Sequence, residues 1–312
     1  MSTAFIFPGQ GSQSIGMMNA LAESSKIVQE TFLEASSVLG YDLWELVTDG
    51  PAEKLNSTEY TQPAMLTAGV ATWRTWLEAG GSVPDLMAGH SLGEYTALVC
   101  ADAISFADAV YLVSDRARFM QQAVPEGEGA MAAILGLDDD EVRKLCFENA
   151  AGEVLQAVNY NAPGQVVVAG SASAVGRLVE NAKAAGAKRA LQLPVSVPSH
   201  CALMQPASDR MSERLKDVTI SQAQVPVIHN VNVQVASDEE EIRQLLARQI
   251  SEPVRWVETI NSMNEKGVTQ LIECGPGKVL CGLSKRINRD MSCIPLITKD
   301  SITTVLGAEN ET

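Results

Sequence analysis

The pentapeptide Gly89-His90-Ser91-Leu92-Gly93 constrains the chain most, because it stands between a short apolar run, 86–88, and a helix-like stretch, 94–101. A serine flanked by two glycines at a strand-to-helix turn is typical of a nucleophile elbow, since glycine allows the sharp turn that exposes the hydroxyl. Ser91 would then lie at a helix N-terminus, where free N–H groups favour developing negative charge. The same pattern arises by chance in strand-turn-helix connections, so other segments must supply what a serine nucleophile needs.

Composition excludes several classes of protein. The 312 residues are 46% hydrophobic and 20% charged, which is ordinary for a globular enzyme of one large α/β domain or two smaller units. A formal charge of −15 argues against a nucleic-acid partner, because phosphate binding needs a basic face. No apolar run reaches membrane-spanning length and no basic segment precedes 4–7, so we expect a cytoplasmic protein without membrane contact. The six cysteines form no C-x-x-C pair, which favours reduced, mostly buried thiols over a disulfide framework.

Strands alternating with helices predict an α/β fold with a mainly parallel sheet covered on both faces. We expect strands at 4–7, 83–88, 227–231, 268–274 and 293–297. Helices are expected at 20–39, from Gln62-Pro63 to 79, at 106–122, at 238–251 and from 277 to 288. No internal repeat interrupts this order.

The segment between residues 127 and 196 has a different order of elements. Strands are expected at 130–135, 154–160, 166–169 and 189–193, with helices at 138–150 and 172–185 and a loop at 159–164. This β-α-β-β-α-β order is the ferredoxin-like split motif. We therefore predict a body made of residues 1–126 and 197–312, with an inserted small lobe at 127–196.

The loop after the first strand is rich in glycine, but it is neither a dinucleotide nor a P-loop motif. Gly9, Gly11 and Gly16 have the wrong spacing and no G-K-[ST] follows. The loop can bring Gln10 close to a site at the carboxyl end of the strand, where α/β sites lie. A plain tight turn is the alternative.

A serine hydroxyl needs an adjacent base, and the chain has three histidines. His90 should leave the elbow in another direction from Ser91, and His229 lies mid-strand, where a buried structural histidine is expected. His200 follows a proline at the junction of the two lobes and can reach a cleft. It is the best candidate by elimination.

Arg116 is predicted to face inward. Ser105 to Asp108 has the form of a capping box that opens a helix, and Arg116 falls on the apolar side of that helix, near Leu112 and Met120. A buried guanidinium keeps its charge and needs a planar anionic partner. That partner is either one of the chain's own acids or an anionic ligand.

Six short motifs follow one another along nearly the whole chain: F-P-G-Q-G-S-Q at 7–13, Y-T-Q-P-A at 60–64, G-H-S-L-G-E-Y at 89–95, R-A-R-F-M-Q at 116–121, V-P-S-H at 197–200 and E-C-G-P-G at 273–277. Each is weak alone, but the ordered set resembles the malonyl-CoA:acyl carrier protein transacylases of type II fatty acid synthesis. The resemblance implies a hydrolase-like α/β body, a ferredoxin-like small lobe and a site between them.

The resemblance also implies roles for single residues. Ser91 would take the malonyl group as an ester, and His200 would remove the serine proton and later activate the incoming thiol. Gln10 and the amide of Leu92 would form the oxyanion hole, and Arg116 would hold the malonyl carboxylate. A backbone carbonyl orients the histidine in this family, and Gln249, in R-Q-I-S-E-P, occupies that place; Asn161 would lie near the pantetheine path.

The implied reaction is a two-step transfer of the malonyl group from malonyl-CoA to the phosphopantetheine thiol of acyl carrier protein, without a metal or cofactor, and it supplies fatty acid biosynthesis. Carrier proteins of this pathway are acidic, so a local basic patch should dock them. The alternatives are a serine hydrolase acting on thioesters, a polyketide-type acyltransferase that prefers another acyl-CoA such as methylmalonyl-CoA, and a non-catalytic carrier-binding module. Candidates for the patch are Lys188, Arg189, Lys285, Arg286 and Arg289.

Overall fold

Strand β1 (Ser2–Phe7) lies at the centre of a five-stranded parallel sheet in the computed structural model, which describes residues 2–195 and 197–309. Its neighbours are β2 (Leu86–Gly89) and β8 (Val268–Glu273), and the outer strands are β7 (Val227–Ile228) and β9 (Ser292–Pro295). Alternate residues of β1 enter two different cores, since Phe5 and Phe7 pack on one face and Ala4 and Ile6 on the other. Both faces are therefore buried, as a parallel sheet requires.

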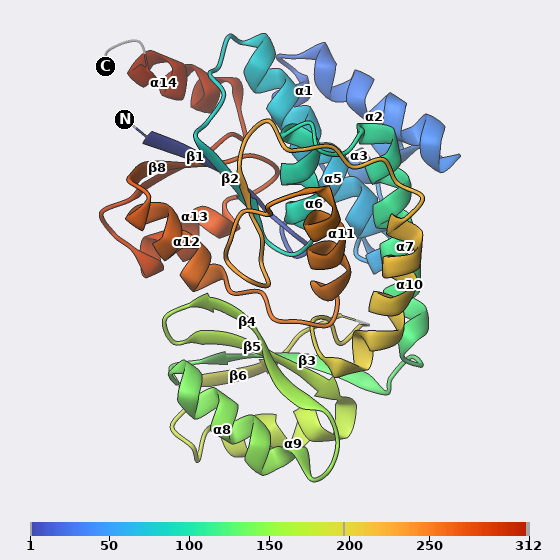
Figure 1. The fold of residues 1–312 in the computed structure, drawn as a ribbon, viewed down its shortest axis with the longest axis vertical. Coiled ribbons are helices and arrows are strands. Elements are labelled where there is room, and N and C mark those ends of the chain that lie inside the picture. The colour runs from blue at the N-terminus through green and yellow to red at the C-terminus, as the bar shows by residue number, and fades with distance from the viewer. Residues whose placement is uncertain (1, 196, 310–312) are drawn as a thin grey trace.

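Helices cover both faces of this sheet (Figure 1). The core around Phe5 and Phe7 takes side chains from α2 (Lys26–Leu39), α5 (Thr58–Glu78), α6 (Leu92–Cys100), α7 (Phe106–Ala123), α10 (Gln205–Leu215) and α11 (Glu239–Arg248). The opposite core takes side chains from α12 (Trp256–Glu265) and α13 (Val279–Ile287). The remaining helices of this part are α1 (Asn19–Ala22), α3 (Leu43–Thr48), α4 (Ala52–Leu55) and α14 (Lys299–Glu309).

A second, antiparallel sheet lies below the first in Figure 1. Its strand order is β4-β5-β3-β6, and α8 (Asp139–Ala150) and α9 (Ala172–Ala182) pack on one of its faces. This order and the β-α-β-β-α-β connectivity are those of the ferredoxin-like split motif, so the predicted fold class is confirmed. The strands are β3 (Gly129–Leu135), β4 (Leu155–Ala162), β5 (Gln165–Ser171) and β6 (Arg189–Gln192).

Backbone hydrogen bonds join the two sheet systems. Val254 donates to the carbonyl of Val158 over 2.8 Å, and Tyr160 donates to the carbonyl of Val254 over 3.0 Å. Met131 and Val167 on the same face of the small sheet pack with Cys201, next to the short 3-10 helix η1 (Ala202–Met204). The face of the small sheet that α8 and α9 leave open is thus turned toward the segment that contains His200.

Several predicted element boundaries are wrong. Helix α5 begins at Thr58 instead of Gln62, because the carbonyl of extended Ser57 accepts the first helical hydrogen bonds, so Pro63 lies inside the helix. The predicted helix 20–39 is broken into α1 and α2, and β7 has two residues instead of five. The expected loop 159–164 is mostly strand, since β4 continues through Ala162. Helices α12 and α14 were not predicted, and the predicted lobe boundary at residue 196 lies outside the described residues.

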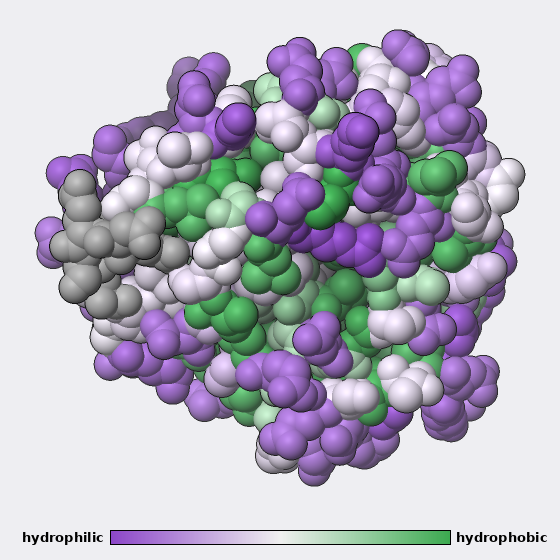
Figure 2. Space-filling view, turned by 90° about the horizontal axis from the view of Figure 1, so that it is seen from above, coloured by the Kyte–Doolittle hydropathy of each residue, from purple (hydrophilic) through white to green (hydrophobic). Residues whose placement is uncertain are grey.

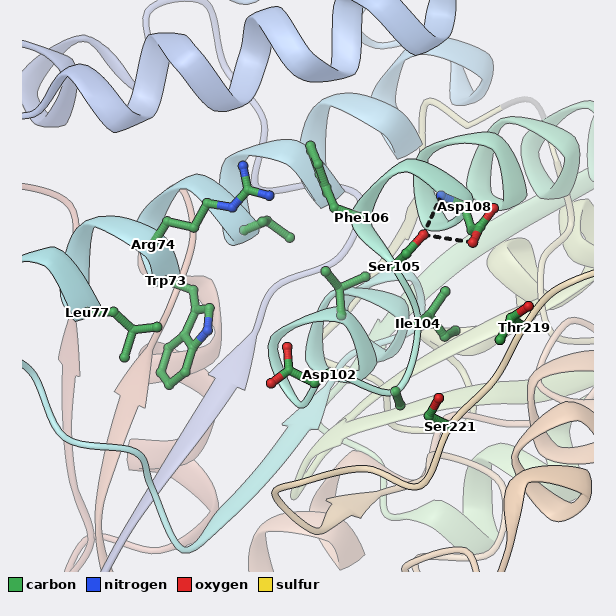
Figure 3. Close-up of a pocket in the computed structure, with 13 residues that line it drawn as sticks. Trp73, Arg74, Leu77, Asp102, Ile104, Ser105, Phe106, Asp108, Thr219 and Ser221 are labelled. Carbon is green, nitrogen blue, oxygen red and sulfur yellow. Dashed lines mark hydrogen bonds between the residues drawn. The ribbon is translucent and has the colours of Figure 1, made fainter.

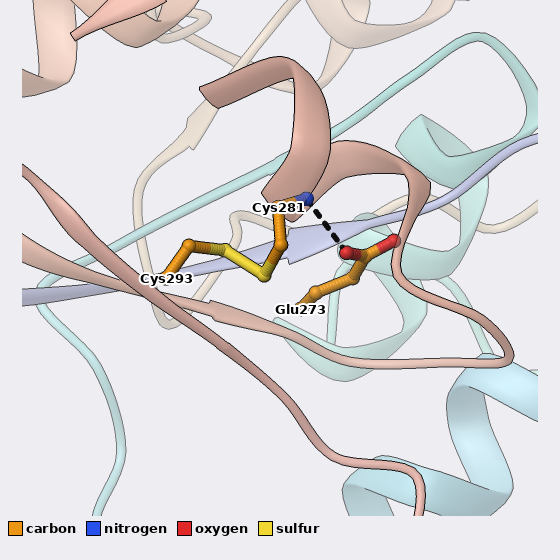
Figure 4. A group of neighbouring side chains, drawn as sticks. All are labelled: Glu273, Cys281 and Cys293. Carbon is orange, nitrogen blue, oxygen red and sulfur yellow. Dashed lines mark hydrogen bonds between the residues drawn. A yellow bond between two sulfur atoms is a disulfide. The ribbon is translucent and has the colours of Figure 1, made fainter. Parts of the chain in front are cut away.

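The expectation for the cysteines is wrong for one pair. Cys281 on α13 and Cys293 on β9 form a disulfide (Figure 4), whereas Cys100, Cys146, Cys201 and Cys274 are free and buried, as predicted. The pair was missed because its members are 12 residues apart and meet only where α13 folds back over the end of the sheet.

No helix among the described residues combines the length and apolar character needed to cross a membrane. On the face seen in Figure 2, hydrophobic residues are interspersed with hydrophilic ones.

Candidate active site

Ser91 occupies a sharp turn between β2 and α6. Its backbone has φ 52° and ψ −112°, a left-handed conformation that is uncommon outside glycine and that occurs at nucleophile elbows. The flanking glycines are required by space, since a Cβ at Gly89 would lie 1.8 Å from the carbonyl carbon of Gly93, and one at Gly93 would lie 2.0 Å from the carbonyl oxygen of Phe7. The predicted strand-turn-helix geometry is therefore present.

The structure brings Ser91 and His200 together. The Ser91 Oγ lies 2.8 Å from Nε2 of His200, and Nδ1 of His200 lies 2.6 Å from the carbonyl oxygen of Gln249, directly after α11. A carbonyl only accepts hydrogen bonds, so Nδ1 carries the hydrogen and Nε2 is free to accept the serine proton. His200 itself has φ 66° and is held by its N–H, which donates to Ile250 over 3.0 Å.

His200 is poised as a neutral base. Its side chain is buried, and burial together with the positive charge of Arg116 lowers its pKa from 6.5 to about 3. The imidazole is thus unprotonated at neutral pH, which is the state that accepts a proton from Ser91.

Arg116 is a buried charge surrounded by neutral oxygens. Its Nη1 donates to Gln62 Oε1 over 2.8 Å, and its Nη2 donates to Gln249 Oε1 over 2.9 Å and to Ser91 Oγ over 3.2 Å. Its side chain is 1% exposed, its Nε has no partner, and no carboxylate of the described residues pairs with it. Of the two predicted kinds of partner, an acidic side chain of the protein is therefore not found among the described residues. The guanidinium is still able to bind an anionic ligand.

Gln249 contacts all three of these residues. Besides its carbonyl and Oε1 contacts, its Nε2 donates to the carbonyl of Ser91 over 2.9 Å. It is fully buried, so one residue links the elbow, the imidazole and the guanidinium.

The candidate oxyanion residues lie at the same cavity. Gln10, Leu92, Ser91, His200 and Arg116 are among the residues lining a cavity of about 110 Å³. Leu92 is the first residue of α6, and the first amides of a helix have no acceptor within it. Gln10 donates through Nε2 to Thr58 Oγ1 over 3.2 Å.

Asn161 is placed differently from the other candidates. It lies in β4 and its Oδ1 accepts from Nε2 of His90 over 2.7 Å. Asn159, two residues earlier on the same strand, is among the residues lining the cavity, together with Met131 and Leu193 from the small sheet system.

Asn230 is a site residue that the sequence did not single out. Its Oδ1 accepts from the N–H of Ser91 over 2.8 Å, and its Nδ2 donates to the carbonyl of Gly89 over 2.7 Å. Glu94, buried in α6, accepts from the N–H of Asn230 over 2.9 Å and contacts Nδ1 of His229 at 2.8 Å. The only available signal was the position of Asn230 just after β7, at the carboxyl edge of the sheet. His229 is held in a buried contact, as predicted, whereas half-buried His90 bonds to Asn161 and is among the residues lining the Ser91 cavity.

A second cavity, of about 530 Å³, lies between α5, α6 and α7 (Figure 3). Ser105 and Ser221 are the two serines of its lining, and Ser105 caps α7, since its Oγ accepts from the N–H of Asp108 over 3.1 Å and donates to the Asp108 carboxylate over 2.7 Å. No histidine is among the described residues that line it, so this cavity does not compete with the Ser91 site.

One group of possible metal ligands occurs within the described residues. Glu273, Cys281 and Cys293 have ligand atoms within 4.8 Å of one another, and the two sulfurs are joined (Figure 4). None of the three lines the Ser91 cavity.

Comparison with known proteins agrees with this geometry. The acyl transferase domain family matches residues 4–301. The malonyl CoA-acyl carrier protein transacylase of Salmonella typhimurium is 58% identical over 284 residues, 91% of this chain and 92% of that protein. The structure of the malonyl CoA-acyl carrier protein transacylase from Coxiella burnetii superposes with a TM-score of 0.97 at 51% identity, over 98% of this chain and 97% of that one.

A further solved structure shows a malonyl-transacylase in complex with a type II PKS acyl-carrier protein. It superposes with a TM-score of 0.97 at 52% identity and covers 99% of this chain and 100% of that chain. The chain therefore belongs to the acyl transferase family, among its malonyl CoA-acyl carrier protein transacylases.

Proposed function

We propose that this protein transfers the malonyl group of malonyl-CoA to the phosphopantetheine thiol of acyl carrier protein through an ester on Ser91, and so supplies fatty acid biosynthesis. The observation that carries the proposal is Arg116, a buried guanidinium that has no acidic partner in the described part of the chain and lies 3.2 Å from the Ser91 Oγ. An acyl group that ends in a carboxylate, as malonyl does, would place its charge there while its thioester carbon meets the serine.

In the first half-reaction, Ser91 Oγ attacks the thioester carbon and gives its proton to Nε2 of His200. The carbonyl oxygen becomes negative and is stabilised by the amide of Leu92 and by Gln10, which turns from Thr58 toward the oxyanion. The C–S bond then breaks, the CoA sulfur takes the proton from His200, and the malonyl group remains on Ser91.

The second half-reaction reverses these steps with a different thiol. The phosphopantetheine thiol gives its proton to His200 and attacks the ester carbon, and the proton returns to Ser91 as the C–O bond breaks. The carbonyl of Gln249 stabilises the imidazolium that forms in each half. The substrates supply all the reacting groups, so the proposed reaction needs neither a metal nor a cofactor.

Arg116 would also select the substrate. Arg116 now faces the partial charges of the Gln62 and Gln249 amide oxygens, and a malonyl carboxylate would add a full negative charge beside it. An acetyl group would leave the guanidinium of Arg116 without an anion. A buried charge left without its partner costs about 2–3 kcal/mol or more, which is enough for strong discrimination.

The two sheet systems would act as two lobes, with residues 1–126 and 197–312 as the body and 127–196 as the small lobe. Met131, Asn159 and Leu193 of the small lobe face the Ser91 cavity, so the pantetheine arm would enter between the lobes, past Asn159 and the neighbouring Asn161. We place the protein in the cytoplasm, where its two substrates would be found.

Docking of an acidic carrier would use exposed basic residues beside this entrance. Arg286 on α13 donates to Gln165 and to the carbonyl of Pro163, both at the turn between β4 and β5. Lys188 packs against Gly136, whose N–H donates to Gly164 in the same turn, over 2.8 Å. The turn would thus join Lys188 and Arg286, one from each lobe, in a patch that Arg189, Lys285 and Arg289 would complete.

The test separates transfer from hydrolysis. The enzyme is incubated with malonyl-CoA, with and without the phosphopantetheine-bearing carrier, and free CoA and malonyl-carrier are measured. We expect about one CoA per enzyme without carrier and continuous release with it. Continuous CoA release that ignores the carrier would identify a thioester hydrolase instead.

A further inference from the structure

Cys281 and Cys293 differ from the other four cysteines in location and exposure. Both are half-buried, whereas Cys100, Cys146, Cys201 and Cys274 are buried. Burial raises the pKa of all four of these other thiols, which makes them poor nucleophiles. The chain therefore has two cysteines that solvent reaches, and they are the two that meet.

The backbone holds these two cysteines at a distance that allows both the disulfide and the reduced form with two free thiols. Cys281 is the third residue of α13, Cys293 is the second residue of the edge strand β9, and their Cα atoms are 5.2 Å apart. This separation lies in the range that disulfides use without backbone movement.

Glu273 supplies a proton acceptor at the same place. It ends β8, is buried, and accepts from the N–H of Cys281 over 2.7 Å and from the N–H of Leu280 over 3.0 Å. Its carboxylate lies within 4.8 Å of both sulfurs (Figure 4). The first turn of α13 thus places a half-buried cysteine beside a carboxylate that can take the thiol proton.

We infer that Cys281 and Cys293 form a reversible thiol modification site, which exchanges with low-molecular-weight disulfides and controls the position of the helix that docks the carrier. In the oxidising direction, Cys281 gives its proton to Glu273 and its sulfur attacks a disulfide RSSR, which forms a mixed disulfide and releases one thiolate. Cys293 then attacks the Cys281 sulfur and releases the second. The two protons end on the two departing RSH molecules, and the two cysteines have lost two electrons to RSSR.

The consequence concerns α13, and this part of the inference rests on the proposed function. The disulfide ties the first turn of α13 to β9, while four to five residues later the same helix carries Lys285 and Arg286 of the docking patch. Arg286 reaches across to Gln165 and Pro163 in the small lobe. Opening the disulfide removes the tether that holds these cations in place, so the open form should bind the carrier less well.

The first test counts thiols in the full-length enzyme. The enzyme is incubated with either a reduced dithiol or oxidised glutathione, denatured and alkylated, and its mass is then measured by mass spectrometry. We expect all six cysteines to be alkylated after reduction and four after oxidation, with a peptide that links residues 281 and 293. Cys281→Ser cannot form the disulfide and should retain one glutathione on Cys293. Cys146→Ser, a buried control in the small lobe, should form the Cys281–Cys293 disulfide like the wild type.

The second test measures function in the same two preparations. We expect the KM for carrier to be severalfold higher in the reduced enzyme, with the rate of Ser91 loading from malonyl-CoA unchanged, and reduced Cys281→Ser to have the same KM as the reduced wild type. Six reactive thiols after oxidation would overturn the modification site. A disulfide that forms but leaves the KM for carrier the same in the oxidised and reduced enzyme would overturn the link between the disulfide and docking. An enzyme without malonyl transfer would contradict the proposed function alone, because the thiol count does not depend on activity.

Discussion

Arg116 is the residue that distinguishes this pocket from a general serine-nucleophile site. Buried arginines are normally paired with carboxylates, and here two glutamines orient the guanidinium without neutralising it. We expect Arg116→Ala to lower kcat/KM for malonyl-CoA about 100-fold, because about 3 kcal/mol of charge-assisted hydrogen bonding is lost, and to keep or increase acetyl transfer. Steady-state kinetics with both CoA esters measure this. Unchanged malonyl kinetics would remove Arg116 from the substrate site.

The charge of Arg116 also acts on His200. Burial is the first cause of the low His200 pKa and the Arg116 charge is the second, so a bound malonyl carboxylate should make the imidazole more basic as the reaction begins. An imidazole with a pKa of about 3 stays neutral when pH falls through 6.5, and loading should not lose activity there. The unfolded chain, in contrast, binds this proton below pH 6.5, so His200 lowers the free energy of unfolding between pH 6.5 and 3.

The pH dependence of acetyl loading tests this coupling, because acetyl-CoA does not need Arg116. For the wild type, kcat/KM for acetyl-CoA should stay flat from pH 8 to about 5, as expected for a base that titrates far below that range. In Arg116→Ala the acid limb should move toward higher pH. A wild-type limb near pH 6.5, or the same limb in both proteins, would contradict the coupling.

Asn230 should position the elbow. It bonds to the backbone that leads into Ser91, at the carbonyl of Gly89 and the N–H of Ser91, and so supports a backbone conformation that is unfavourable by itself. We expect Asn230→Ala to lower kcat about 100-fold, as for a shift of about 1 Å at the nucleophile, with KM values little changed. The matched control is Asn149→Ala in the small lobe, which removes a similarly buried asparagine.

The two asparagine variants separate positioning from stability. Both should lose about 1–3 kcal/mol of unfolding free energy, since each leaves buried groups without partners. Only Asn230→Ala should react slowly with a fluorophosphonate that labels Ser91. Equal labelling rates in the two variants would show that Asn230 is merely structural.

At the scale of elements, helix α13 contacts the small lobe through Arg286 and carries two of the expected docking residues, Lys285 and Arg286. Lys285→Glu should raise KM for the carrier about fivefold, which corresponds to about 1 kcal/mol for an exposed charge, and leave the malonyl-CoA kinetics alone. Lys144→Glu on α8 is the control, since that lysine is also exposed and lies outside the patch. An equal effect of Lys285→Glu on both substrates would contradict docking.

Elements were predictable where local signals and burial agree. Ser105 caps α7 and Asp138 closes a capping box on α8, and both helices begin within one residue of the predicted start. The predicted start of α5 is wrong because proline is typical of a first helical turn, whereas Pro63 lies farther along this helix, where one backbone hydrogen bond is lost and the first residues are still buried. Strand β7 was overestimated, since its apolar run continues into a turn that closes on Gln234.

At the scale of the molecule, the sequence predicted the two sheet systems and the meeting of Ser91 with His200, which are 109 residues apart. Contacts that depend on side-chain packing could not be predicted. Gln62 lies in the motif at 60–64 and Asn230 at the carboxyl edge of the sheet, but neither position predicts a contact with Arg116 or Ser91. The Cys281–Cys293 pair likewise depends on how α13 folds back on the sheet edge.

The central claim is that Ser91 carries the malonyl group with His200 as its base. The most direct measurement is the intact mass of the enzyme after brief exposure to malonyl-CoA, followed by mapping of the modified peptide. We expect one malonyl group on Ser91 in the wild type, none in Ser91→Ala, and much slower labelling in His200→Ala. A malonyl group at another residue, or an unchanged labelling rate in His200→Ala, would contradict the account.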